Sequence, residues 1–419
     1  MLYQTHARIH LANIRRNLSH IRAFLGPGPR LLFAVKANGY GHDAVAVATM
    51  AEREGLADWF GVSTVPEGLE LREAGVERPI LKFSPSFPEE LGAALEGGLT
   101  LAVAEPTGAQ ALEAACAARG VQARVHLKLD TGMGRTGIPA EEAGALTRLI
   151  RRTCPALEVE GVFTHLSVAD QAQEGDYTRD QIRRFQSATE TVAGVLGRMP
   201  ELIHCASSGA ILSHPESWFT MVRVGSIGYG YYPLHYPDRP LDLVPGLSLL
   251  TRISFLKKVR RGASIGYGRT WKAPVDTWIA TLPVGFADGF DRLLSNRGRV
   301  LWNGRYCPVV GLVCMDQCMI DLGPATTAQV GDEVVLIGRS GDQEITTTDL
   351  AESKGSIPCE ITCQIGPRVP RVADAVAEPA PAGATRGAAR KRSFGGGRWP
   401  SGPGASVGPE RAGAPDEGH

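Results

Sequence analysis

Short apolar stretches, many of them rich in β-branched residues, alternate with longer stretches of mixed polarity over the first half of the chain. The longer stretches are rich in Ala, Leu, Glu and Arg, and several end at a glycine, as helices often do. Alternating strand–helix units of this kind predict a parallel sheet. The predicted strands are Leu31–Val35, Trp59–Val62, Ile80–Phe83, Thr100–Val103, Arg124–Leu129, Val159–Thr164, Leu202–Cys205 and Met221–Val224.

The number and length of these units favour a (β/α)8 barrel over a doubly wound sheet. About eight units in about 230 residues fit the barrel, and the glycine-rich GxGxxG expected after the first strand of a dinucleotide-binding sheet is missing. We therefore expect a barrel domain over residues 1–238. The predicted helices include Asp43–Gly55, Pro66–Gly75, Pro106–Gly120 and Ala140–Arg152.

The pattern changes where prolines cluster between Tyr232 and Pro245, and beyond them the long helical stretches cease. The apolar stretches that follow are short and are separated by turn signals such as Asn303-Gly304 and Gly331-Asp332. We expect a mostly antiparallel β-rich domain over residues 239–372. Its predicted strands are Leu247–Val259, Trp278–Pro283, Val300–Trp302, Pro308–Val313, Cys318–Leu322 and Glu333–Ile337.

The last part of the chain, residues 373–419, consists mainly of Ala, Gly, Pro and Arg with almost no large apolar residues. Such a segment buries too little surface to offset the entropy lost on ordering. We expect a disordered tail. Its basic run Arg390-Lys391-Arg392 could contact an anionic partner, although a solvated tail is the simpler interpretation.

Composition narrows the classes of protein. Of the 419 residues, 43% are hydrophobic and 21% charged, as in ordinary globular proteins. Lys plus Arg and Asp plus Glu both total 44, so no overall field favours nucleic acid. No secretory signal opens the sequence, and no apolar run approaches the roughly 20 residues that span a bilayer. We expect a cytoplasmic protein that binds neither nucleic acid nor membrane.

The 8 cysteines do not indicate a metal site. Cys314 and Cys318 are four residues apart, as are Cys359 and Cys363, so neither pair has CxxC spacing, and no pair of histidines completes a zinc set. Reduced thiols are the expected state.

The most informative local segment is Val35-Lys36-Ala37-Asn38-Gly39-Tyr40-Gly41-His42, at the end of the first predicted barrel strand. In such barrels the catalytic residues collect at the carboxyl ends of the strands. An unpaired ammonium is costly to bury, and a lysine here avoids that cost through an exposed ion pair or through a Schiff base with a carbonyl cofactor. The segment by itself leaves both interpretations open.

Further polar residues are expected at the same mouth of the barrel. Loops after the seventh and eighth strands are the usual phosphate site of this fold. A lysine, a histidine, two arginines and a phosphate cradle together suit pyridoxal phosphate. The residues are Arg135 after the fifth predicted strand, His165 at the end of the sixth, Ser208 after the seventh, and Arg223, Gly225 and Ser226 at the eighth.

The segments VKANGYGH, LDTGMGRTG, FTHLSVAD, HCASSGA, MVRVG, IGYGRT, FADGF and GLVCMDQCMIDL follow one another in this order along the sequence. With these segments the chain resembles the alanine racemases across residues 8–372. The resemblance implies a pyridoxal-phosphate enzyme of fold type III and a homodimer whose active sites are shared between subunits. It implies interconversion of L- and D-alanine through a cofactor aldimine by a two-base mechanism, supplying D-alanine for peptidoglycan.

The resemblance also implies roles for individual residues. Lys36 would hold the cofactor and act as one acid/base, and Tyr267 would be the opposite one, reaching over from the partner subunit. Lys128 matches a position that can be carbamylated. The cofactor-binding residues implied are Lys36, Tyr40, His165, Ser208, Arg223, Gly225 and Ser226, with Arg223 at the pyridine nitrogen and His165 beside it. The substrate-binding residues implied are Arg135, Met315 and Asp316.

Two acid/base groups on opposite faces suit racemisation, because a proton must leave one face of the substrate and return to the other. Lys and Tyr both have ordinary pKa values of about 10, so nearby cations such as Arg135 and Arg223 are needed to lower them. An arginine at the ring nitrogen stays protonated and leaves that nitrogen largely unprotonated. This weakens the electron sink and discourages side reactions.

Three alternatives remain open. A broad-specificity racemase would need a larger pocket than the Cys314-Met315-Asp316-Gln317 segment favours. A decarboxylase on this fold would place an acidic residue where this chain has Arg223. A cofactor-carrying barrel without catalysis would lack the β-rich domain and Tyr267.

The chain departs from the family pattern at two positions. Pro367 stands where many relatives have a tyrosine that contacts the phosphate, so that contact is absent or made elsewhere. Cys359 stands where a tyrosine is frequent, and the sequence assigns it no role.

Overall fold

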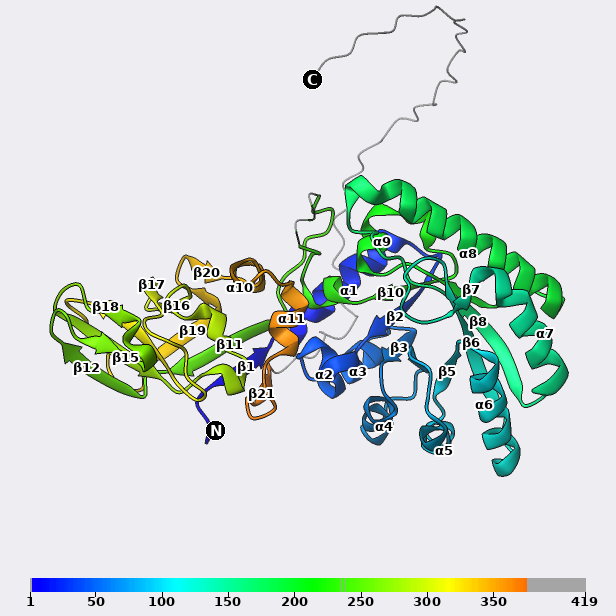
Figure 1. Cartoon of the computed structure of the whole chain (residues 1–419), viewed down its shortest axis with the longest axis horizontal. Coiled ribbons are helices and arrows are strands. Elements are labelled where there is room, and N and C mark those ends of the chain that lie inside the picture. Colours follow the sequence, from blue (N-terminus) through cyan, green and yellow to red (C-terminus); the bar gives the residue numbers. More distant parts are fainter. Residues whose placement is uncertain (1, 235, 237, 375–419) are drawn as a thin grey trace, which may run out of the picture. The chain divides into compact units, whose positions relative to one another are not determined.

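Eight parallel strands from the first part of the chain form a nearly closed barrel with helices on its outside (Figure 1). The structure is a computed structural model, and it describes residues 2–234, 236 and 238–374. The strands follow chain order around the barrel, and the last one pairs with the first. They are β2 (Arg30–Ala34), β3 (Trp59–Val62), β4 (Ile80–Lys82), β5 (Thr100–Val103), β6 (Ala123–Asp130), β8 (Leu157–Phe163), β9 (Leu202–His204) and β10 (Met221–Val224), with β7 (Ile138–Pro139) beside β6.

The barrel closes differently on the two sides of β10. On one side β10 pairs in parallel with β2, so that Val224 lies beside Phe33. On the other side, no ladder joins β9 to β10 within the described residues, and single backbone bonds link them, such as Arg223 N–H to the Ala206 carbonyl at 3.0 Å. The expected (β/α)8 barrel is confirmed, and its predicted strands agree with the observed ones to within two residues at each end.

The helices around the barrel begin and end where local signals place them. Thr64 and Glu67 form a reciprocal capping box at the start of α4, and Gly120 ends α6 in a left-handed conformation. Across the described ranges, no helix is long and apolar enough to cross a bilayer. The helices are α1 (Leu11–Leu25), α2 (Lys36–Tyr40), α3 (Ala44–Arg53), α4 (Val65–Glu73), α5 (Pro88–Glu96), α6 (Pro106–Arg119), α7 (Ala143–Thr153), α8 (Gly175–Leu196) and α9 (Ser208–Ser213).

The second part of the chain forms mostly antiparallel sheets, as expected (Figure 1). The larger sheet, in the order β17-β16-β19-β11-β1-β21, includes β1 (His6–Ile9), which pairs with β11 and β21. A smaller sheet has the order β12-β15-β18. The elements are β11 (Leu247–Arg252), β12 (Phe255–Val259), β13 (Ser264–Ile265), β14 (Trp271–Lys272), β15 (Thr277–Leu282), β16 (Arg299–Trp302), β17 (Arg305–Pro308), β18 (Cys318–Gly323), β19 (Glu333–Ser340), β20 (Gln343–Ile345), β21 (Arg371–Ala373), α10 (Thr347–Lys354) and α11 (Pro358–Cys363).

The prediction of one strand over Leu247–Val259 is wrong. The segment forms β11 and β12, which belong to different sheets. The break lies at Ile253 and Ser254, whose amides donate to the carbonyls of Asp332 and Thr281, respectively. Apolar residues continue through the break because Ile253 is itself buried, so the hydrophobic pattern carried no sign of it.

The prediction of a strand over Pro308–Val313 is also wrong. β17 ends at Pro308, Val309 makes only an isolated antiparallel bridge with Ile320 of β18, and the residues after it continue in irregular backbone. The amides of Gly311 and Val313 donate to the side chains of Asn296 and Ser295, at 2.7 and 2.9 Å, instead of to a neighbouring strand. Burial and one short contact with β18 therefore give this segment the hydrophobic pattern of a strand without a continuous ladder.

The disordered tail predicted for residues 373–419 falls almost entirely outside the described residues. Ala373 ends β21, and the amide of Asp374 donates to the Ile9 carbonyl at 2.9 Å. Residues 375–419 lie outside the part of the chain that the structure describes.

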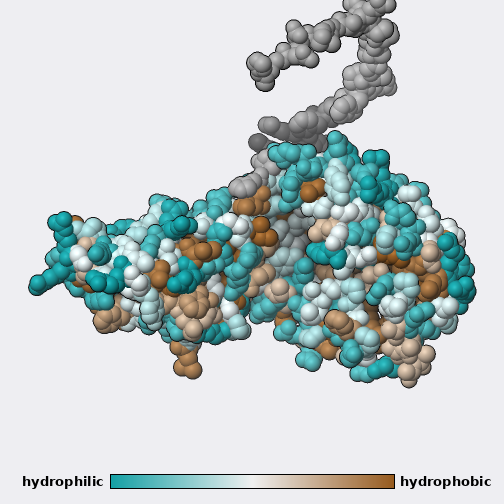
Figure 2. Space-filling model, viewed as in Figure 1, coloured by the Kyte–Doolittle hydropathy of each residue, from teal (hydrophilic) through white to brown (hydrophobic). Residues whose placement is uncertain are grey.

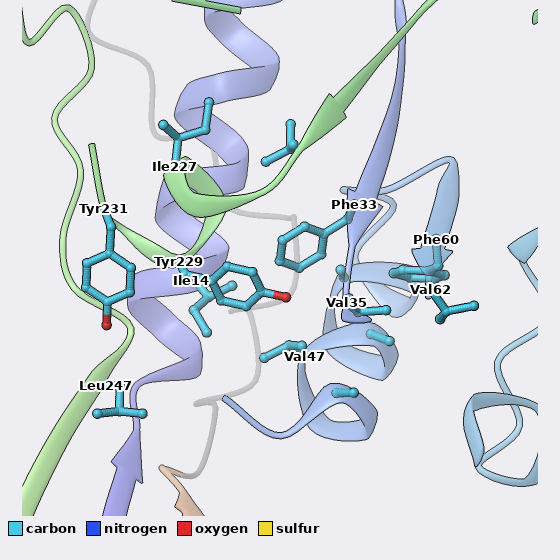
Figure 3. Packing of buried hydrophobic residues seen from close by; sticks show 14 of the residues in the cluster. Ile14, Phe33, Val35, Val47, Phe60, Val62, Ile227, Tyr229, Tyr231 and Leu247 are labelled. Carbon is cyan, nitrogen blue, oxygen red and sulfur yellow. The ribbon is translucent and has the colours of Figure 1, made fainter. Parts of the chain in front are cut away.

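A cluster of aromatic side chains packs around Tyr229 beside the end of β2 (Figure 3). The Tyr229 ring lies 5.0 Å from the rings of both Phe33 and Tyr40, and its hydroxyl donates to the Ala34 carbonyl at 3.0 Å. The buried His42 ring lies 4.7 Å from the same tyrosine. Hydrophilic and intermediate residues, by contrast, cover most of the surface seen in Figure 2. The aromatic cluster thus packs against the end of β2 and holds its last carbonyl, that of Ala34, by a hydrogen bond.

We predict that Gly41→Ala destabilises the protein through a clash between the segment after β2 and α11. Gly41 has φ 85°, and a Cβ there would lie 2.1 Å from the Thr362 carbonyl oxygen. Gly75, with φ 88° and no atom within 4 Å of such a Cβ, provides the control. Gly75→Ala should cost only the left-handed strain of about 1–2 kcal/mol, and Gly41→Ala about 1–3 kcal/mol more. Urea unfolding measures both, and equal losses would contradict the clash.

Candidate active site

A cavity of about 580 Å³ opens at the carboxyl ends of the barrel strands. Its volume lies in the range usual for small-molecule sites. It brings together most of the residues that the sequence marked, although those residues are spread over nearly 200 positions of the chain. The marked residues that line it are Lys36, Tyr40, Lys128, Arg135, His165, Ser208, Arg223, Gly225 and Ser226.

Lys36 opens a short left-handed turn. Ala37, Asn38 and Tyr40 have φ values of 53°, 51° and 53°, and Gly39 between them has φ 62°. Each non-glycine residue in this conformation costs about 1–2 kcal/mol. Two side chains hold it, one from outside the turn and one from within: the Ala37 amide donates to Glu67 at 2.7 Å, and the Asn38 side chain accepts from the Ala44 amide at 2.9 Å. The strain is thus concentrated directly beside the lysine, as is common at functional sites.

The environment of Lys36 favours its neutral amine. Burial lowers the pKa of Lys36, and the nearby charge of Arg135 lowers it further, whereas Glu67 acts in the opposite direction. A neutral amine is the form that acts as a base or nucleophile. The structural setting thus shifts Lys36 towards the reactive form.

Lys128 is a second lysine with a suppressed charge. It is buried on β6, its Nζ donates to the Leu129 carbonyl at 2.9 Å, and it lies 5.2 Å from the centre of the Phe163 ring. Burial, followed by the charge of Arg223, lowers the pKa of Lys128 to about 7. A substantial fraction of its amine is therefore neutral at neutral pH.

Arg135 reaches the cavity from a loop that is held by Asp130. The Asp130 carboxylate accepts from the amides of Gly132, Met133 and Gly134 at 2.9–3.2 Å. Burial by itself would raise the pKa of Asp130, but these backbone donors lower it, so the carboxylate remains an acceptor. One side chain at the end of β6 thus orders the whole turn that carries Arg135.

Arg223 is a buried guanidinium whose terminal nitrogens are fully engaged. Nη1 and Nη2 donate to three backbone carbonyls and to two imidazole nitrogens, those of His204 and His165, all within 2.9–3.1 Å. Burial lowers the pKa of Arg223 to about 10, which still leaves it charged at neutral pH. Its Nε makes no hydrogen bond to the described residues. One directed donor of Arg223 therefore remains for a ligand in the cavity.

His165 is neutral in this environment. Burial, followed by the charge of Arg223, lowers the pKa of His165 well below its usual range. Because its Nδ1 accepts from Arg223 at 3.0 Å, its proton is on Nε2. His165 can therefore donate, but it cannot add positive charge.

Two hydroxyl groups meet beside Gly225. The Gly225 amide donates to Ser208 Oγ at 3.1 Å, and a Cβ at Gly225 would lie 2.9 Å from the Tyr40 hydroxyl and 3.5 Å from Ser208 Oγ. Only a glycine leaves this space open. Hydroxyl groups and backbone amides at the ends of the last barrel strands suit a phosphate.

These observations fit pyridoxal phosphate. Of the described residues, four lysines and arginines and a single acidic residue, Asp170, line the cavity, which suits a ligand that carries a phosphate. The hydroxyl cradle beside Gly225 and the donor left on Arg223 match the two ends of the cofactor, and Lys36 offers an amine. Within the described ranges, no cluster of three or more His, Cys, Asp or Glu residues could hold a metal.

Three residues that the resemblance marked are not brought to the cavity. Tyr267, Met315 and Asp316 are absent from its lining. Tyr267 and Met315 are 73% and 57% exposed, and Asp316 accepts from Arg368 at 2.8 Å. One copy of the chain therefore does not assemble every residue that was expected at the site.

The structure also adds residues that the sequence did not single out. Phe83, Asp170 and Tyr232 line the cavity, and so does Cys359, to which the sequence assigned no role. Phe83 was seen only as the end of a strand, and Tyr232 only as the start of a proline-rich stretch. Their places depend on loops between elements, for which the sequence carried no signal.

Both parts of the chain match families of known proteins. The alanine racemase N-terminal domain family matches residues 9–233, and the alanine racemase C-terminal domain family matches residues 246–373. The chain is 46% identical to the alanine racemase of Cutibacterium acnes, over 88% of this chain and 97% of that protein. It is 45% identical to the alanine racemase of Symbiobacterium thermophilum, over 88% and 96%.

Solved structures agree with these sequence matches. The alanine racemase of Clostridium difficile 630 is similar with a TM-score of 0.84 and 33% identity, covering 89% of this chain and 96% of that one. The alanine racemase of Bacillus anthracis, solved with bound L-Ala-P, has a TM-score of 0.84 and 35% identity, covering 90% and 96%. The chain therefore belongs to the alanine racemase family.

Proposed function

We propose that this protein is a pyridoxal-phosphate-dependent alanine racemase that interconverts L- and D-alanine and supplies D-alanine for peptidoglycan. The observation that carries the proposal is the single cavity in which Lys36, the hydroxyl cradle at Gly225 and the remaining donor of Arg223 meet. Family membership supports the same substrate. Tyr40, Ser208, Gly225 and Ser226 would hold the phosphate.

In this proposal two side chains move protons at the substrate Cα. Bound pyridoxal phosphate supplies a conjugated system that stabilises negative charge at that carbon. Lys36 Nζ takes or returns a proton on one face, because burial and Arg135 favour its neutral amine. The Tyr267 hydroxyl serves the opposite face. Arg135 is placed to bind the substrate carboxylate, together with Met315 and Asp316.

Arg223 and His165 set the charge around the cofactor ring. Arg223 stays protonated and can only donate, so a ring nitrogen facing its Nε remains an acceptor without a proton. His165 beside it stays neutral because burial and Arg223 lower its pKa. An arginine rather than a carboxylate at this place also disfavours a decarboxylase.

The site is completed, we propose, by a second copy of the chain in a homodimer. Tyr267, Met315 and Asp316 do not line the cavity of their own chain, and Tyr267 is 73% exposed on η5 (Tyr267–Arg269). In a closed two-fold dimer the same surface serves both copies, so each copy would offer these residues to the other.

Lys128 is proposed to carry a carbamate. Carbon dioxide reacts with neutral amines, and the pKa of about 7 that burial gives Lys128 provides that form near neutral pH. A carbamate would replace a positive charge near Arg135 and Arg223 by a negative one. It would therefore help to hold Arg135 in place.

Incubation with either enantiomer of alanine in D2O should give racemisation with deuterium at Cα, because a solvent-exchanged proton returns to that carbon. Lys36→Ala is expected to remove both effects. Enantiomers are separated by chiral chromatography and deuterium is measured by mass spectrometry. Turnover of leucine or arginine comparable with alanine would favour a broad-specificity racemase, and release of carbon dioxide would favour a decarboxylase.

Borohydride reduction followed by peptide mapping should place the phosphopyridoxyl group on Lys36. Two other buried lysines provide internal controls: Lys82 is held by loop carbonyls at 2.9 and 3.2 Å, and burial lowers the pKa of Lys128 to about 7. Label on Lys128 would contradict both the assignment of Lys36 and the proposed carbamate.

Mixing Lys36→Ala with Tyr267→Phe should restore activity if the site is shared. Each homodimer lacks one acid/base at both sites, whereas a mixed dimer has one site with both defects and one intact site. With free exchange about half of the dimers are mixed, so recovery should approach about a quarter of the wild-type rate per site. The same mixture without exchange is the control. No recovery despite demonstrated mixed dimers would rule out a shared site.

A further inference from the structure

Arg223 carries its charge among neutral partners. It is 6% exposed, and its hydrogen bonds go to backbone carbonyls and to two imidazoles. Burial, followed by the charge of Arg223, lowers the pKa of both His165 and His204 well below the usual range, so these rings are neutral. A buried charge without a counter-charge is costly. Among the described residues no carboxylate bonds Arg223 directly, so a carboxylate that acts on its charge has to do so from further away.

A chain of side chains leads from Arg223 to a carboxylate inside the barrel. Arg223 Nη1 lies 3.1 Å from His204 Nδ1, and His204 Nε2 lies 2.9 Å from His126 Nδ1. His126 Nε2 lies 3.6 Å from Glu160 Oε2. Both histidines are completely buried and Glu160 is 8% exposed.

The direction of every bond in this chain follows from Arg223. A guanidinium only donates, so His204 Nδ1 accepts and the proton of this neutral ring is on Nε2. His204 therefore donates to His126 Nδ1, which places the proton of His126 on Nε2, facing Glu160. The alternative tautomer of either ring would bring two donors or two bare nitrogens together.

The barrel backbone is shaped around this chain. The pairing of β6 with β8 shifts between Val125 and His126, where Val125 lies beside Val159 and His126 beside Gly161. Glu160 is thus the extra residue of a bulge, a device that redirects a side chain. A Cβ at Gly161 would lie 2.8 Å from the His126 ring, so a glycine is required next to the imidazole.

Aromatic neighbours fix the orientation of the two imidazoles. The Phe163 ring stacks on His204 with centres 4.9 Å apart and planes 2° apart, and the Trp59 ring lies 5.4 Å from His126. Rings held in this way cannot turn to exchange their nitrogens without disturbing the barrel interior. The tautomers are therefore set by geometry as well as by hydrogen bonding.

At the Glu160 end of this series of side chains, two buried polar atoms lack hydrogen-bond partners among the described residues and lie next to each other. His126 Nε2 and Glu160 Oε2 are buried and form no hydrogen bond, and they face one another at 3.6 Å. A small approach would form a bond to a charged acceptor, which is stronger than one between neutral groups. The other carboxylate oxygen lies 3.5 Å from Arg124, whose side chain is exposed. The series of side chains from Arg223 to Glu160 thus continues, through Arg124, to the surface of the protein.

We propose that Glu160, His126 and His204 are positioning residues for Arg223. The carboxylate supplies a remote counter-charge, and the two imidazoles transmit it as a chain of hydrogen bonds with one fixed direction. The chain holds the guanidinium so that Nε faces the cavity. The effect on catalysis rests on the proposed function, in which Arg223 Nε meets the cofactor ring nitrogen. The arrangement of Glu160, His126 and His204 behind Arg223 does not depend on that function.

The first test is the protonation of the two rings in the full-length protein with its cofactor, labelled with ¹⁵N-histidine. Long-range ¹H–¹⁵N spectra should show His126 and His204 neutral, with the proton on Nε2 and a bare Nδ1. Loss of signals in His126→Gln and His204→Gln assigns them. A proton on Nδ1 of His204, or a doubly protonated ring, would overturn the proposal without any measurement of activity.

The second test removes only the counter-charge. Glu160→Gln keeps the shape of the side chain and should shift the Nε2 and Nδ1 signals of both histidines. It should also lower kcat by roughly tenfold with KM unchanged, about the size of one charge-assisted contact, because a neutral amide then replaces the carboxylate 3.6 Å from His126 Nε2. Glu158→Gln is the matched control, because Glu158 is exposed on the same strand and faces the same Arg124 at 3.9 Å.

The outcomes separate a positioning role from a structural one and from the proposed function. If Glu160→Gln lowers only the unfolding temperature and leaves the imidazole signals unchanged, the positioning role is wrong. Equal effects of Glu160→Gln and Glu158→Gln would also overturn it. If the imidazole spectra are as expected but the wild-type protein racemises no alanine, the chain of hydrogen bonds stands and the proposed function falls.

Discussion

The arrangement of the site depends on one buried charge, the guanidinium of Arg223. Its terminal nitrogens bind the carbonyls of Thr164, His204 and Cys205, which lie just beyond or at the ends of β8 and β9. Arg223 lies on β10, which forms no ladder with β9 in the described residues. Its side chain therefore links the barrel where backbone pairing is least complete. Closure of the barrel and orientation of the remaining Nε donor are therefore two results of one set of bonds.

The positive charge at this mouth changes the chemistry of its neighbours. Lys36, Lys128, Arg135 and Arg223 line one cavity, where Asp170 is the single acidic residue in the described part of the chain. Burial and mutual repulsion both work against protonation, which lowers the pKa of both lysines and favours neutral amines. An anionic ligand would relieve the repulsion. The positively charged lining therefore favours a phosphate before any ligand binds.

The lysine itself is presented by strained backbone. The left-handed turn from Ala37 to Tyr40 is held by Glu67, by the Asn38 side chain and by the aromatic cluster around Tyr229. Gly41 then allows the carbonyl of Thr362 on α11 to approach. Elements far apart in the sequence thus fix the position of Lys36, and contacts within the segment alone would not hold this turn.

By itself the sequence determined the barrel strands, the change to a β-rich second part and the residues gathered at the barrel mouth, because the hydrophobic period and the motifs around Lys36 and Arg223 are local signals. Only the tertiary structure decided that β1 joins the sheet of the second part, that Leu247–Val259 breaks between two sheets, and that Glu160 lies behind Arg223 through His126 and His204. Such pairings join residues far apart in the chain. Their free energy comes from burial and hydrogen bonds that exist only once the chain has folded.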